Sequence, residues 1–252
     1  MNLKRFSLCF AVLMGTGASA LHAQPPDSGA IHPGVVLIQG AAGEAVYRSG
    51  FESQMAAWKR AATKAGAEIL AIGDTVGARP ADSTPAGAAS TTIVTDRIRL
   101  EKILAELPPD GSAAVWLVLI GHGTWDGKEA RFNLEGPDLS AGDLAGWLKP
   151  VQRPVVVINT SSSSSPFMPV LSGPGRTVIT ATRSGNERNF ARFGEFFAAS
   201  LDDPAADYDQ DGQFCLLEWF LRAGSRTTEF YLSERSMPMP SPAVGGMPYS
   251  SA

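Results

Sequence analysis

Short, continuous apolar runs recur along the chain and end in glycine or polar residues. They lie at residues 34–40, 67–73, 113–120, 154–158 and 177–181. Strands that are buried on both faces have this pattern, whereas half-buried strands alternate apolar and polar residues. The pattern therefore predicts a largely parallel sheet whose two faces are both covered.

Segments with helical spacing lie between several of these runs. Residues 51–65 place apolar side chains on one helical face, and Gly66 is a suitable end for that helix. Residues 96–107 have similar spacing, and Ser140 with Asp143 matches the spacing of a capping box. Strands that alternate with helices predict an α/β fold, with helices on both faces of the sheet. In such folds the chemistry gathers at the carboxyl ends of the strands.

The first 23 residues have the three-part pattern of a secretory signal peptide. Lys4 and Arg5 precede an apolar stretch, and small residues follow as far as Ala20 and Ala23. The apolar stretch is much shorter than the roughly 20 residues that a membrane span requires, and no later segment reaches that length. We therefore expect an exported protein, periplasmic or secreted, with no membrane span in its mature part.

The remaining residues indicate one domain followed by a tail. Residues 24–235 are expected to form that domain, because the connection at residues 79–92 joins elements of one sheet rather than two separate units. Residues 236–252 have no periodicity and are expected to be disordered. The oligomeric state is left open by the sequence.

Charge and residue counts exclude several functions. The chain has 21 Lys and Arg against 25 Asp and Glu, a net charge of −4, and no basic stripe, so nucleic-acid binding is disfavoured. The mature part would keep two histidines, His32 and His122, and one cysteine, Cys215. A histidine-rich zinc site and an internal disulfide are therefore excluded.

Two of the predicted strand ends carry residues with catalytic chemistry. His122 follows the run 113–120 between two glycines, where the amide of Gly123 could donate to an oxyanion. A serine run at 161–165 follows the run 154–158, and the next apolar segment begins at once. We expect this serine run to be a strand-to-helix turn rather than a linker. A purely structural turn remains the alternative at His122.

Four segments occur in an order that is shared with a known family. They are GAAGEAVYR at 40–48, the pair His122-Gly123, VVVINTSSS at 155–163, and residues 180–187. Together they resemble the caspase-like cysteine peptidases, and within them the legumain branch. The resemblance covers about residues 34–200 and implies a caspase-like three-layer αβα sandwich.

The resemblance also implies roles for individual residues. His122 and Gly123 would be catalytic, and Ser161 would occupy the position of the nucleophilic cysteine. Arg48 and Glu187 would line the pocket for the residue that precedes the cleaved bond. A serine hydroxyl ionises far less readily than a thiol, and the caspase-like dyad has no carboxylate to orient its histidine.

The serine therefore implies a catalytically degenerate homologue that binds a peptide or protein segment without cleaving it. The alternative is an active peptidase or other hydrolase that uses His122 and Ser161. Neither reading requires a cofactor for catalysis.

A further motif lies at residues 207–218, which match the twelve-residue EF-hand calcium loop position by position. The alternative is a turn that caps the following helix. Pro204 breaks the incoming helix and no second loop accompanies this one, so we expect weak calcium binding. A calcium-stabilised structural or interaction protein is thus a second alternative function. The expected metal ligands are Asp207, Asp209, Asp211, Gln213 and Glu218.

Overall fold

The computed structural model describes residues 34–73, 94–108 and 111–236. The predicted signal peptide, nearly all of the predicted tail and the connection at 79–92 lie outside these residues. The predicted strands are present in a five-stranded sheet, in which every neighbouring pair is parallel and the order is β2-β1-β3-β7-β8. The strands are β1 (Val35–Gln39), β2 (Ile69–Ile72), β3 (Val115–Ile120), β7 (Val155–Asn159) and β8 (Arg176–Thr180).

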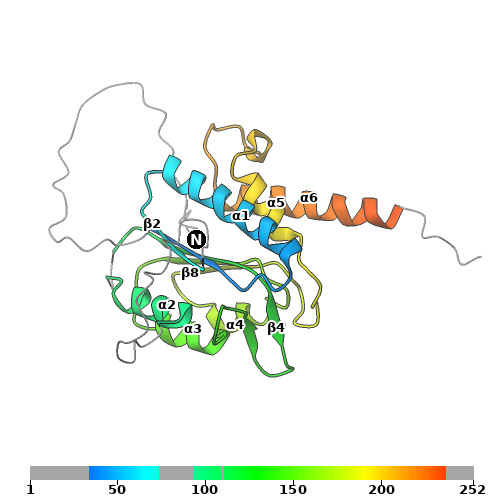
Figure 1. The fold of residues 1–252 in the computed structure, drawn as a ribbon. Helices are drawn as coiled ribbons and strands as arrows, with labels where there is room; N and C mark the ends of the chain where they lie inside the picture. The colour runs from blue at the N-terminus through cyan, green and yellow to red at the C-terminus, as the bar shows by residue number, and fades with distance from the viewer. Residues whose placement is uncertain (1–33, 74–93, 109–110, 237–252) are drawn as a thin grey trace, which may run out of the picture.

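Helices cover both faces of this sheet (Figure 1). One face carries α1 (Ala45–Lys64), α5 (Phe193–Ser200) and α6 (Leu216–Ser236). The other face carries α2 (Asp96–Ala105), α3 (Ala141–Leu148) and α4 (Phe167–Leu171). The predicted α/β class, a three-layer αβα sandwich with a parallel sheet, is therefore confirmed.

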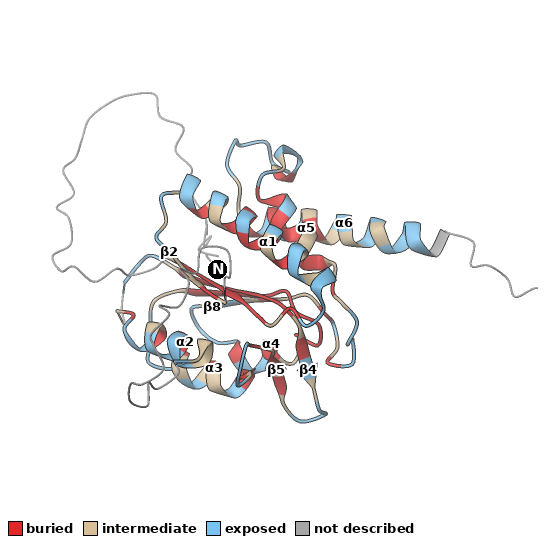
Figure 2. Ribbon diagram, in the orientation of Figure 1, coloured by how far each residue is buried: buried red, intermediate tan, exposed pale blue. Residues whose placement is uncertain are grey.

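The central strand β3 explains why the strands read as unbroken apolar runs. Trp116 and Val118 pack into the core beneath α1, α5 and α6, whereas Leu117 and Leu119 pack into the core beneath α2, α3 and α4. All four side chains are buried, and Figure 2 shows much of the main sheet coloured as buried between the two layers of helices. Because both faces of the strand are covered, no position along it favours a polar residue.

A small antiparallel sheet, which the sequence pattern did not predict, follows β3 directly. It contains β4 (Gly123–Trp125), β5 (Ala130–Phe132) and β6 (Leu139–Ser140). Its Phe132 is fully buried, and its ring lies so close to Gly40 and Gly121 that a Cβ atom at either glycine would meet Phe132 at 3.0 Å. The small sheet is thereby fixed to the carboxyl ends of β1 and β3.

Some helix boundaries differ from the sequence prediction. Helix α1 begins at Ala45, so the segment 40–48 is partly helical rather than a loop throughout. Helix α5 was not predicted, and α6 continues to Ser236, far beyond the short helix expected after the acidic loop. In the part of the chain that the structure describes, no helix is long and apolar enough to cross a membrane.

Candidate functional site

Polar residues are buried where the strands of the main sheet end. The strand order reverses between β1 and β3, and in open α/β sheets ligands bind beyond the carboxyl ends of the strands at such a point. His122 lies two residues after β3, next to this reversal. Buried polar side chains lie at the ends of β1 and β7 and directly after β7, and they are those of Gln39, Asn159, Thr160, Ser161, Ser162, Ser163 and Ser164.

The His122 ring is half-buried among aromatic side chains. It packs edge-on against Tyr47, with ring centroids 4.7 Å apart and planes 87° apart. The ring centroids of Phe51 and Phe190 lie 5.2 and 6.2 Å from that of His122. Within the described residues no hydrogen bond to the imidazole is present. Its nitrogens are therefore available to a ligand, on the side of the sheet that α1 covers.

Ser161 is fully buried, and its hydroxyl already has a protein partner. The hydroxyl donates to Oδ1 of Asn159 at 2.7 Å, and the Ser161 amide donates to the same oxygen at 3.1 Å. A Cβ atom placed on Gly123 would lie 2.7 Å from the Ser161 Oγ. The structure thus brings Ser161 next to Gly123, whereas no hydrogen bond joins Ser161 to His122 among the residues described.

The Gly123 amide is engaged as well. It donates to Ser162 Oγ at 3.2 Å, and the same hydroxyl donates to the Gly123 carbonyl at 3.1 Å. An oxyanion donor must point at the position where the negative charge develops. In this structure the Gly123 amide points at Ser162 instead, so its catalytic role remains a prediction.

The serine run forms a turn between β7 and α4, and hydrogen bonds fix its conformation. Ser163 has a φ of +52°, which is unusual for a residue other than glycine, and its amide donates to the Glu187 carbonyl at 2.9 Å. Ser164 Oγ accepts from the amides of Ala181 at 3.1 Å and Thr182 at 3.3 Å. The run is therefore a buried strand-to-helix turn, as the sequence predicts, and not a linker.

The two predicted pocket residues lie on different elements. Arg48 is exposed on the first turn of α1, and no carboxylate of the described residues lies within ion-pair distance of it. Glu187 is exposed in the loop after β8, where its Oε1 accepts from the amides of Arg183 at 2.9 Å and Ser184 at 2.8 Å. The Glu187 carboxylate therefore holds its own loop, and its role in a pocket stays a prediction.

A cavity of about 750 Å³ lies between that loop and α6. Residues 181–183 and 186–193 form one wall, and Thr227 and Tyr231 are among the residues of the other. Phe190 borders this cavity and also packs near His122, with ring centroids 6.2 Å apart, whereas His122 itself is not among the residues that line the cavity. Arg192 lies over the Phe190 ring, with its guanidinium carbon 5.4 Å from the ring centroid.

Three aspartate side chains of the acidic loop lie close together. Oxygen atoms of Asp207, Asp209 and Asp211 all lie within 4.8 Å of one another. Asp207 Oδ2 accepts from the Gly212 amide at 3.1 Å, and Asp207 Oδ1 is buried with no hydrogen-bond partner among the described residues. The main-chain N–H of Gln213 donates to Asp211 Oδ1 at 2.7 Å. Three predicted ligands are thus brought together.

Glu218 closes the same loop from the first turn of α6. Its side chain is buried, with Oε1 accepting from the Tyr208 amide at 2.9 Å and Oε2 accepting from the Cys215 amide at 2.8 Å. Burial opposes ionisation of this carboxyl, but the hydrogen bonds from the main chain outweigh it and lower the Glu218 pKa. The main chain of its own loop therefore holds the Glu218 carboxylate, which is not part of the cluster that the three aspartates form.

Sequence reasoning missed the buried amide side chains around the site. Oε1 of Gln39, Oε1 of Gln54 and Nδ2 of Asn159 are buried without a hydrogen-bond partner in the described part of the chain. The sequence did carry a signal for Gln39 and Asn159, because each is the first polar residue after an apolar run.

Comparison of the chain with protein-family models, curated proteins and solved structures found no match.

Proposed function

We propose that the protein is an exported, catalytically degenerate homologue of the caspase-like and legumain-like peptidases, and that it binds a peptide or protein segment. The observation that carries this proposal is the Ser161 hydroxyl, which is fully buried and donates to Asn159 at 2.7 Å. A catalytic serine must reach its substrate and pass its proton to a base. Ser161 meets neither condition in this arrangement, which supports binding without cleavage.

The surroundings of His122 support a binding role. Tyr47 and Phe190 enclose the ring, and aromatic side chains supply large contact areas with few rotatable bonds. The cavity beside Phe190 gives an adjoining space for a side chain of the bound segment. Arg48, exposed near Tyr47, would favour a segment that carries an acidic or amide group.

A peptide library incubated with the mature protein tests this proposal. We expect some peptides to be retained and none to be cleaved, as followed by mass spectrometry. His122→Ala and Phe190→Ala should each raise the Kd for the retained peptides about tenfold or more, which is a loss of roughly 1.4 kcal/mol of binding free energy. Lys102→Ala on α2, on the opposite face of the sheet, is the control and should change nothing.

Two results would overturn the proposal in different ways. Cleavage that is lost in both His122→Ala and Ser161→Ala would establish the active hydrolase instead. If wild type, His122→Ala and Phe190→Ala retain the peptides equally, the peptides bind somewhere other than this site.

We propose, second, that the loop 207–218 binds calcium. This is supported by the three aspartate oxygens within 4.8 Å of one another and by the ordered carboxylate of Glu218. Calcium prefers such hard oxygen ligands, and a single loop of this type is expected to bind with a Kd of about 10⁻⁴–10⁻³ M. The bound ion would tie the short helix η1 (Pro204–Ala206) to the start of α6. Thermal unfolding with and without calcium tests it.

A further inference from the structure

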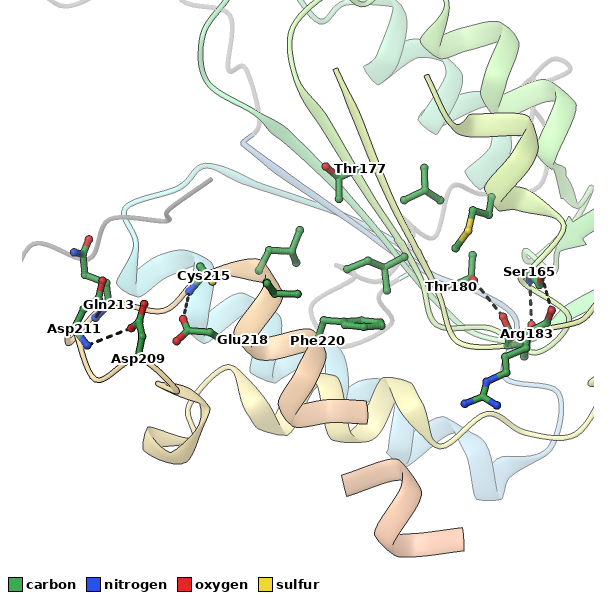
Figure 3. A pocket seen from close by; sticks show the side chains of 16 residues that line it. Ser165, Thr177, Thr180, Arg183, Asp209, Asp211, Gln213, Cys215, Glu218 and Phe220 are labelled. Atoms are coloured by element: carbon green, nitrogen blue, oxygen red, sulfur yellow. Dashed lines mark hydrogen bonds between the residues drawn. The ribbon is translucent and has the colours of Figure 1, made fainter. Parts of the chain in front are cut away.

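A second groove lies away from His122, along the edge of the main sheet at β8. It has a volume of about 890 Å³ and is lined by β8 residues 177–180, by Met168 of α4, and by Leu217 and Phe220 of α6 (Figure 3). Strand β8 is the last strand in the sheet order, with β7 as its one neighbour in the described structure. The groove therefore lies where a further strand would extend the sheet.

The main chain of β8 presents unpaired groups to this groove. The Val155 amide donates to the Gly175 carbonyl, and the Ala181 amide donates to the Asn159 carbonyl. In a parallel pair alternate residues bond to the same neighbour, so the odd-numbered residues of β8 face β7. Val178 and Thr180 therefore direct their N–H and C=O groups outward. An edge of this kind is a template for another strand.

Exposed apolar side chains are present on the helices at both faces of this edge. Met168 and Val170 of α4 are 41% and 47% exposed, and Leu217 and Phe220 of α6 are 61% and 39% exposed. Exposed large apolar side chains that gather at one place are typical of interaction sites, and Met168, Leu217 and Phe220 all line this groove. A strand added at β8 would thus be covered by apolar groups on both faces, as the inner strands are.

The two ends of the groove carry opposite charge. Asp209 and Asp211 lie at one end and Arg183 lies at the other (Figure 3). Arg183 follows the carboxyl end of β8, whereas the acidic loop lies toward the amino end. A second β8 that runs antiparallel to the first would bring its own Arg183 to the acidic end. The edge is therefore complementary to itself, as a two-fold interface must be.

We propose that β8 pairs with β8 of a second copy of this chain, antiparallel, about a two-fold axis at Val178. In this register Val178 exchanges both main-chain hydrogen bonds with the partner's Val178. The Thr180 amide donates to the carbonyl of the partner's Arg176. The Arg176 amide already donates to the Gly173 carbonyl at 3.1 Å. The proposed register therefore needs only the Arg176 carbonyl, which accepts from the partner.

Sedimentation equilibrium of the mature protein, in buffer with chelator, tests this pairing independently of peptide and calcium binding. We expect a reversible dimer. Val178→Pro removes an N–H that points outward and leaves the bonds to β7 in place, so this variant should be a folded monomer with an unchanged circular dichroism spectrum. Leu217→Lys should also be monomeric, because it places charge on the apolar cover of the edge.

Two matched variants separate this interface from a general change of surface. Ile98→Lys alters a comparably exposed apolar residue on α2, 44% exposed, and should leave the dimer intact. Arg183→Glu should raise the dimer dissociation constant about tenfold at low salt, and adding Asp211→Arg to it should restore the affinity by exchanging the two charges.

The contrary results are clear. A wild-type protein that is monomeric at all concentrations overturns the proposal, and so does a dimer that survives both Val178→Pro and Leu217→Lys. If the protein is a monomer and the NMR signals of Val178 and Leu217 shift when a foreign peptide binds, the groove is a site for that peptide and not for a second copy.

Discussion

Ser162 and Gly123 hold the ends of β7 and β3 together. Ser162 Oγ accepts from the Gly123 amide at 3.2 Å and donates to the Gly123 carbonyl at 3.1 Å, so one hydroxyl satisfies both main-chain groups of the glycine. The contact fixes the serine turn against the loop that carries His122. It also leaves Ser161 between Asn159 and Gly123, where the Ser161 hydroxyl is buried.

An engineered thiol at position 161 would report directly on this arrangement. We expect Ser161→Cys, in a Cys215→Ser background, to be alkylated about tenfold more slowly than a free thiol with a pKa of about 8.5, because its side chain is buried. Adding His122→Ala should not change that rate. The measurement is the alkylation rate against pH. A reactive thiol whose pKa depends on His122 would contradict the binding-only proposal and favour the hydrolase.

Gly123 is required because two chain segments approach it closely. A Cβ atom there would lie 2.7 Å from Ser161 Oγ and even nearer the Ser162 carbonyl oxygen. We expect Gly123→Ala to lower the free energy of unfolding by about 2 kcal/mol or more, since main chain must move. Chemical denaturation measures this change.

The matched control for that substitution is Gly146→Ala in α3. No atom lies within 4 Å of a Cβ at Gly146, so this variant should gain about 0.5–1 kcal/mol from its higher helix propensity. Equal effects of the two substitutions would show that the Gly123 contacts are not restrictive.

The main sheet could be predicted because the same physical rule applies along its central strands. Val155 to Asn159 is buried at every position, so this segment reads as one apolar run ending in an amide. The Ser140 and Asp143 side chains form the expected capping box at α3. By contrast, β6 has two residues and β4 has three, too few for any periodicity to appear.

The site could be predicted in part. The sequence predicts that His122 and Ser161 each follow a strand and lie at the same edge of the sheet, because parallel strands end at one edge, and the structure adds that β3 and β7 are neighbours. The direction of the Ser161 hydroxyl could not be predicted. It depends on the turn conformation, in which Ser163 has a positive φ and Asn159 folds its side chain over the turn. The early start of α1, which puts Tyr47 against the His122 ring, was missed for lack of a capping residue: Glu44 makes no side-chain cap.

Calcium should stabilise the fold by mass action if the acidic loop binds it. At a calcium concentration ten times the Kd, the gain is about 1.4 kcal/mol, which corresponds to roughly 3–6 °C in Tm for a domain of this size. Asp207→Asn should abolish the difference between calcium and chelator. Asp202→Asn alters an exposed carboxylate just outside the loop, so this variant should keep the difference in Tm between calcium and chelator. Identical melting curves for the wild type in calcium and in chelator would leave the loop as a helix cap.

The Asp203 and Arg222 pair should make stability fall in acid. Arg222 Nε lies 2.7 Å from Asp203 Oδ2, and this hydrogen bond is the largest cause of the lowered Asp203 pKa. Because the pKa is lower in the folded state, the unfolded state binds more protons at a given acidic pH. The contribution of Asp203 is therefore complete above its unfolded pKa of about 3.9 and is lost as the pH falls through the folded value.

Urea denaturation between pH 6 and pH 3 measures this dependence. We expect Asp203→Asn to lower the free energy of unfolding by about 1 kcal/mol at pH 6 and to reduce the slope of stability below pH 4. Glu106→Gln is the control, because Glu106 is exposed and lies 3.8 Å from Lys102, a geometry that contributes little. If Asp203→Asn keeps the wild-type slope in acid, the hydrogen bond to Arg222 does not hold the carboxylate in solution.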